Sequence, residues 1–137
     1  MNPIIENIIN RKVSCYFVSP HLDDAVLSCG SLMEYLSRNG VPVSVPTIFT
    51  KAGNLHTISA RAFMKQCGID DAFHLFACRR KEDKKILESI GVSWAHLGFV
   101  DALWRQKRSM PFANFVGKIL PELVHLYPTY RFHITSG

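Results

Sequence analysis

Three signals are missing from this 137-residue sequence, and each absence excludes a class of protein. No apolar run approaches the roughly 20 residues that a membrane-spanning helix needs. The N-terminus lacks the basic-then-apolar layout of a secretory signal peptide. Neither a Gly-x-Gly-x-x-Gly loop nor a Gly-Lys-Ser/Thr loop is present, which argues against a nucleotide-binding α/β protein. We therefore expect a cytoplasmic protein without a membrane span.

Cysteine is sparse and unpatterned. The four cysteines show no Cys-x-x-Cys spacing, so a zinc ribbon and a thioredoxin-like redox pair are not expected. Buried free thiols are the simpler interpretation of Cys15, Cys29, Cys67 and Cys78.

The net charge of +5 does not by itself indicate a nucleic-acid partner. The basic residues gather in residues 79–81, 84–85 and 105–108, and the first group is followed by Glu82 and Asp83, as on a solvated helix face. No zinc-finger, RNP-type or helix-turn-helix pattern accompanies them. We expect no nucleic-acid partner, and attraction of an anionic substrate explains the charge at least as well.

Predicted strands and helices alternate along the chain, which favours an α/β fold with a mostly parallel sheet and right-handed crossovers. The sequence predicts one domain over residues 1–137. Two prolines in the strand at 41–50 suggest an edge position or irregular ends, and Pro20 is expected to end the first strand. Pro121 is expected to kink the last helix. Helices are predicted at 4–10, 25–39, 58–67, 79–90 and 112–126, and strands at 13–18, 41–50, 73–76, 92–97 and 130–135.

The run Ser19-Pro20-His21-Leu22-Asp23-Asp24 carries the clearest chemical signal. It stands between a strand and a helix, where α/β proteins commonly build their sites. The spacing lets a tight turn aim His21 and Asp24 at one metal ion, while Asp23 points differently and is able to sit near that ion without ligating it. Because zinc lowers the pKa of bound water to about 7, a neighbouring carboxylate is then able to take the proton.

The same residues also have ordinary structural interpretations. Adjacent aspartates before a helix often serve only as an N-cap and a dipole partner, and a lone histidine in a turn is often only hydrogen-bonded. Catalytic zinc sites usually have three protein ligands, so a further ligand is needed. His56 and His133 are candidates, whereas His96 is expected in the core.

The motif, with Leu27 and Gly30 after it, resembles the Pro-His-x-Asp-Asp signature of the PIG-L and LmbE-like zinc-dependent de-N-acetylases. Two later blocks are also similar to the family: Arg79-x-x-Glu82 on a helix that ends at residues 90–91, and the segment 97–101, Leu-Gly-Phe-Val-Asp.

The resemblance implies a Rossmann-like, three-layer α/β fold and hydrolysis of an N-acetyl group from an N-acetylglucosamine-type sugar or glycoconjugate. On the matching positions, it makes His21 and Asp24 zinc ligands and Asp23 the general base. It also places Arg79 and Asp101 near the substrate pocket. Their alternatives are an ion pair of Arg79 with Glu82 or Asp83 on the helix surface and a turn or cap role for Asp101.

One departure from the family pattern changes the expectation for this chain. The resemblance implies a third zinc ligand in a His-x-x-His motif, which does not occur here. We therefore expect the N-terminal portion of the domain. The alternative function is a catalytically inactive fragment that acts at most as a sugar-binding module. An unfinished sheet would also favour self-association, so a homo-oligomer is expected.

Overall fold

The computed structural model describes residues 2–107 and 112–126. The chain divides into two compact units. The first comprises residues 1–50 and 78–99, and the second comprises residues 51–77 and 100–137. The predicted α/β class and mostly parallel sheet are confirmed, whereas the prediction of a single domain stays a prediction.

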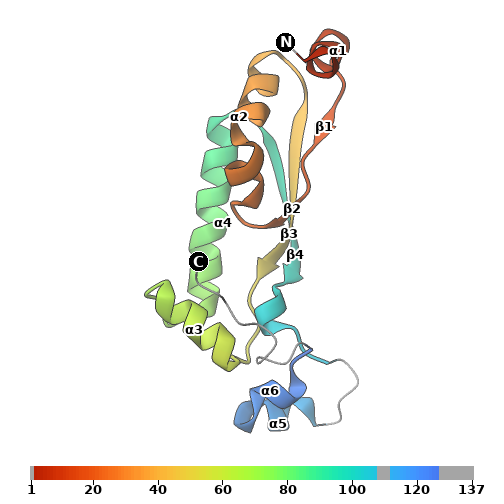
Figure 1. Cartoon of the computed structure of the whole chain (residues 1–137). Coiled ribbons are helices and arrows are strands. Elements are labelled where there is room, and N and C mark those ends of the chain that lie inside the picture. The colour runs from red at the N-terminus through yellow and green to blue at the C-terminus, as the bar shows by residue number, and fades with distance from the viewer. Residues whose placement is uncertain (1, 108–111, 127–137) are drawn as a thin grey trace. The chain divides into compact units, whose positions relative to one another are not determined.

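The sheet is centred on β3 (Val43–Lys51), which pairs with β1 (Cys15–Tyr16), β2 (Ser19–His21) and β4 (Ser93–Val100). β1 and β2 both run parallel to β3, and the arrow of β4 points the same way as that of β3 (Figure 1). Each β3 residue lies 28 positions beyond its partner on β1 or β2. β1 and β2 are therefore two segments of one interrupted strand.

The prediction of an edge position for β3 is wrong, and the register explains how a proline fits a central strand. The Cys15 and Phe17 amides donate to the Pro42 and Ser44 carbonyls, both at 2.9 Å. Every second residue, from Pro42 through Ser44 on β3, therefore turns its backbone polar groups toward the interrupted strand of β1 and β2. Pro46, the next in that series, has no N–H to donate, and it faces the break between β1 and β2.

Pro20 does not end the first strand as predicted, because it is the middle residue of β2. Every second residue of this strand turns its backbone N–H and C=O toward β3. These residues are Cys15 and Phe17, followed by Ser19 and His21 on β2. The nitrogen of Pro20 consequently points away from β3, so the pairing of β2 with β3 loses no hydrogen bond.

The predicted helices at 4–10, 25–39 and 58–67 are confirmed as α1 (Pro3–Arg11), α2 (Asp24–Arg38) and α3 (Ile58–Gln66). The predicted helix at 112–126 is divided at its proline into α5 (Ala113–Ile119) and α6 (Pro121–Val124). A 3-10 turn, η1, spans Ala102–Trp104. None of the described helices is long and apolar enough to cross a membrane. The predicted strand at 130–135 lies outside the described residues.

The predicted strand at 73–76 is wrong, because these residues begin α4 (Ala72–Ser89). Ala72, Leu75 and Phe76 are all buried, and their i, i+3, i+4 spacing is helical. The Asp71 carboxylate accepts a hydrogen bond from the Phe73 amide at 2.8 Å and so supports the first turn.

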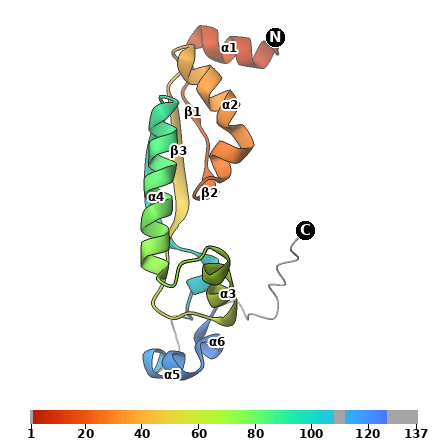
Figure 2. The same ribbon diagram turned by 90° about the vertical axis from the view of Figure 1, so that its left-hand side faces the viewer.

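The core of the first unit lies between the sheet and two helices. In Figure 1, α2 and the part of α4 from residue 78 onward lie on the same side of the strands, and Figure 2 shows them from that side. Alternate residues of β3 face this layer. The buried cluster consists of Met33, Leu36, Val41, Val43, Val45, Leu87 and Val92.

Trp104 is the centre of the second unit. Its side chain is buried and makes edge-on ring contacts with Phe76 at 5.4 Å and with Phe63 at 6.4 Å between centroids. Thr57 caps α3 by accepting from the Ala60 amide at 3.2 Å. A large aromatic side chain thus fixes the short elements of this unit.

All four cysteines are free, as predicted, but the prediction that they are buried is wrong. Cys67 is exposed, and the other three are partly exposed: Cys15, Cys29 and Cys78.

Candidate functional site

The His21–Asp24 turn lies in the first unit, where β2 ends and α2 begins. His21 is the last residue of β2, and Asp24 is the first residue of α2. Leu22 between them is buried with an exposed fraction of 1% and anchors the turn. The location expected from the sequence, at the carboxyl end of a parallel strand, is therefore confirmed.

His21 and Asp24 are brought together at the turn. The Asp24 Oδ2 atom lies 3.1 Å from the His21 Nδ1 atom and also accepts from the His21 backbone amide at 3.1 Å. Both side chains are a little under half exposed, at 44% and 45%. The His21 ring also leans against Phe49, with centroids 5.6 Å apart. One nitrogen and one carboxylate oxygen thus converge at an accessible point.

Asp23 has a strained backbone and a separate set of partners. Its φ of 78° lies in the left-handed region that non-glycine residues rarely adopt. Its amide donates to Asp83 Oδ1 at 3.2 Å. Its carboxylate accepts from the Arg79 guanidinium at 3.3 Å, and the same Arg79 nitrogen donates to the Leu22 carbonyl at 3.0 Å. The Asp23 carboxylate thus has a partner on α4, and its place near a metal ion stays a prediction.

Side-chain capping does not account for the two aspartates. Asp23 occupies the N-cap position of α2 but makes no capping hydrogen bond with its side chain. Ser19 caps instead: its hydroxyl accepts from the Ala25 amide at 3.1 Å and donates to the His21 carbonyl at 2.7 Å. The carboxylates of Asp23 and Asp24 are therefore left for other interactions.

Arg79 reaches the turn from α4, although the alternative from the sequence was an ion pair with Glu82 or Asp83 on the helix surface. Its ion pair is with Asp23, and the two side chains are 27% and 31% exposed. Arg79 thus holds the turn at two oxygen atoms.

Sequence reasoning missed Asp83 and its partner. Asp83 was expected on a solvated helix face, but its exposed fraction is 2%. Its Oδ2 atom lies 2.9 Å from the Nε2 atom of His96 on β4. The signal that could have found Asp83 is its helical spacing from Phe76 and Leu87, which are both buried.

Asp101 follows β4 as predicted and belongs to the second unit. Its carboxylate accepts from the Leu103 amide at 3.0 Å and caps η1, and its own amide donates to the Lys51 carbonyl at 2.9 Å. This is the cap role that the sequence left open as an alternative. A part in substrate binding stays a prediction.

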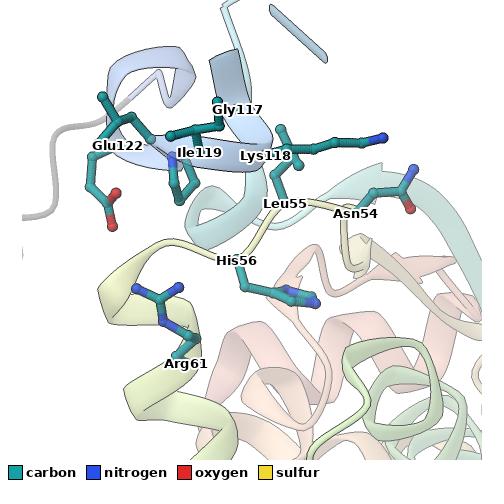
Figure 3. A pocket seen from close by; sticks show the side chains of 10 residues that line it. Asn54, Leu55, His56, Arg61, Gly117, Lys118, Ile119 and Glu122 are labelled. Carbon is teal, nitrogen blue, oxygen red and sulfur yellow. The ribbon is translucent and has the colours of Figure 1, made fainter. Parts of the chain in front are cut away.

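The second unit has a cavity of about 490 Å³ that the sequence did not indicate (Figure 3). His56 lines it from the segment that leads into α3, and Arg61 lines it from α3 itself. Lys118 and Glu122 line it from α5 and α6. The Trp104 indole donates to His56 Nδ1 at 2.8 Å. That nitrogen is an acceptor, so the proton of the neutral ring lies on Nε2.

The order of these blocks along the chain corresponds to a known family. Residues 16–131 match the family described as PIG-L, GlcNAc-PI de-N-acetylase. The chain belongs to this family. The match includes the His21–Asp24 turn, Arg79 and Asp101, and it confirms the resemblance found in the sequence.

Individual PIG-L relatives are deacetylases. The chain is 29% identical over 113 residues to the 2'-N-acetylparomamine deacetylase of Niallia circulans. This match covers 74% of the chain and 41% of that protein. A deacetylase from teicoplanin biosynthesis, solved with teicoplanin, shares 32% identity with a TM-score of 0.64, over 70% of this chain and 38% of that chain. A zinc-inhibited form of teicoplanin deacetylase also shares 32% identity, with a TM-score of 0.63. That match covers 70% of this chain and 36% of that chain.

The chain thus spans about two fifths of the length of the relatives it matches.

The His21–Asp24 pair suits a zinc ion as part of a site. Zinc accepts imidazole nitrogen and carboxylate oxygen at about 2.0–2.2 Å, so two ligands of a tetrahedral ion lie about 3.4 Å apart. The 3.1 Å between His21 Nδ1 and Asp24 Oδ2, which here form a hydrogen bond with each other, is close to that separation. Within residues 2–107 and 112–126, no group of three or more His, Cys, Asp or Glu side chains is placed to hold a metal. The pair fits the ion but supplies two ligands.

Proposed function

We propose that this protein is a zinc-dependent hydrolase that removes the N-acetyl group from an N-acetylglucosamine-type amino-sugar derivative. The observation that carries the proposal is the approach of His21 Nδ1 and Asp24 Oδ2 to 3.1 Å at an accessible turn. Membership of the PIG-L family and similarity to the paromamine and teicoplanin deacetylases support it. Cytoplasmic location and the lack of a nucleic-acid partner stay predictions.

Each residue of the turn has a distinct part in the proposed reaction. His21 and Asp24 would hold zinc, which when bound would polarise the acetyl carbonyl and supply water as the nucleophile. Asp23 would accept the proton of the attacking water and pass it to the leaving amine. Arg79 keeps the Asp23 carboxylate in place, and Asp101 is the further candidate for substrate binding.

Zinc binding by the purified chain tests the first part. We expect His21→Ala and Asp24→Ala to weaken zinc affinity at least about tenfold, because each removes one donor of the pair. The matched control is His74→Ala, which removes an exposed histidine from α4. Isothermal titration with zinc measures all four proteins. A wild-type chain that binds no more zinc than His21→Ala would overturn the proposed metal site.

Acetate release from an N-acetylglucosaminyl glycoside, with zinc supplied, tests the second part. We expect Asp23→Asn to keep zinc affinity but to lower the rate about 10²–10⁴-fold, the usual contribution of a general base. Equal rates for Asp23→Asn and wild type would exclude Asp23 as the base. Sugar binding without acetate release would instead favour the inactive sugar-binding alternative.

A further inference from the structure

Asp83 is a buried carboxylate that the proposed reaction does not use. Its exposed fraction is 2%, although its neighbours on α4, Glu82 and Lys84, are exposed. Burial of an ionised carboxylate is unfavourable unless hydrogen bonds replace the lost water. Two partners do so here, the Asp23 amide at 3.2 Å and His96 Nε2 at 2.9 Å.

A hydrogen-bond acceptor for the Asp23 amide stabilises the most strained backbone position of the turn. The left-handed conformation at φ 78° is unfavourable for a residue with a side chain and persists only when the surroundings hold it. Asp83 Oδ1 accepts the amide hydrogen of this residue, and Arg79 fixes its carboxylate from the same helix, one turn earlier. Backbone and side chain of Asp23 are thus both held by α4.

His96 fixes the other oxygen of Asp83. An ionised carboxylate only accepts hydrogen bonds, so His96 donates from Nε2. The His96 side chain is 12% exposed and packs against the Trp94 ring, with centroids 4.7 Å apart. A short chain of contacts therefore runs from β4 through Asp83 to the backbone of Asp23.

We propose that Asp83, held by His96, is a positioning residue for Asp23. It keeps the strained turn in the conformation in which the Asp23 carboxylate contacts Arg79. The inference rests on the proposed function, because Asp23 matters for catalysis only if it is the general base. Its direct consequence, local order at Asp23, requires neither zinc nor substrate.

Amide hydrogen exchange of the metal-free chain, measured residue by residue by NMR, tests the inference. We expect Asp83→Leu to speed exchange of the Asp23 amide about tenfold or more, because the amide loses a charged acceptor. Exchange of buried β3 amides such as that of Val45 should stay unchanged. The matched control is Glu82→Leu, which removes the adjacent, exposed carboxylate and should leave the Asp23 amide as in the wild type.

Variants of His96 test the contact between His96 and Asp83. They also replace Asp83→Leu as the test if that variant does not fold. His96→Leu removes the donor to Asp83 and should speed Asp23 exchange, whereas His96→Gln keeps an N–H donor and should restore it. Unchanged Asp23 exchange in folded Asp83→Leu and His96→Leu would overturn the inference, as would an equal rise at Val45. Failure of the zinc titration would count against the proposed function alone.

Discussion

Two acidic sites of the chain look alike in sequence and differ in how they are held. In the first unit, Asp23 follows β2 and is held by Arg79 and Asp83, which are 56 and 60 positions away. In the second unit, Asp101 follows β4 and accepts from Leu103, two positions away. The amides of both residues donate to distant oxygen atoms, those of Asp83 and Lys51, so the difference lies in the contacts of the carboxylates. The carboxylate of Asp23 contacts a distant arginine on α4, whereas the carboxylate of Asp101 caps the next turn.

The largest expected effect comes from breaking the second unit. Trp104→Ala should lower the free energy of unfolding of this unit by about 3–5 kcal/mol, because a buried aromatic ring is replaced by a cavity. Urea denaturation followed by amide exchange measures this loss. Phe115→Ala, which truncates a ring that is 69% exposed, is the control and should cost far less. Equal losses for the two variants would contradict the central role of Trp104.

A smaller effect is expected at the network of the first unit. Arg79→Gln should lower the free energy of unfolding by about 1–2 kcal/mol, because Leu22 and Asp23 lose a partly buried charged donor. Arg38→Gln removes an arginine whose side chain is 77% exposed and paired with Glu34, so about 0.5 kcal/mol or less is expected. The midpoints of chemical denaturation of the two variants, each compared with that of the wild type, measure the two losses in stability. If Arg38→Gln proved as harmful as Arg79→Gln, the turn would not depend on α4.

The smallest effect is a gain. A glycine inside a helix often permits close packing, but a Cβ at Gly30 would meet only Val26 Cγ1, at 3.6 Å, among the described residues. Gly30→Ala should therefore raise the free energy of unfolding by up to about 1 kcal/mol. Gly40, with φ 72°, is the contrasting position, and Gly40→Ala should be destabilising. Thermal melts of both variants decide the signs, and a loss of stability for Gly30→Ala would contradict this assignment.

The sequence predicted local features well and long-range ones poorly. The helix predicted at 25–39 and the spacing of His21 and Asp24 are both properties of neighbouring residues, and the structure agrees with them. The strand predicted at 73–76 and the solvated Asp83 were wrong for one shared reason. Both predictions relied on residue type, β-prone or charged, although the helical spacing of the buried residues continues through α4.

The central position of β3 could not be predicted, because it depends on register. Pro46 is compatible with a central strand only when the facing strand is interrupted at the same level, and β1 and β2 supply that break. The partners of Asp23 were hidden similarly, because the packing of α4 brings together residues that are far apart in the sequence.

The positive φ of Asp23 has a consequence for protein engineering. Glycine adopts that conformation without a steric penalty, so Asp23→Gly would relax the backbone. The same substitution would remove the ion pair with Arg79 and the carboxylate proposed for proton transfer. The two effects on stability oppose each other, so position 23 should be kept fixed in any library selected for thermal tolerance.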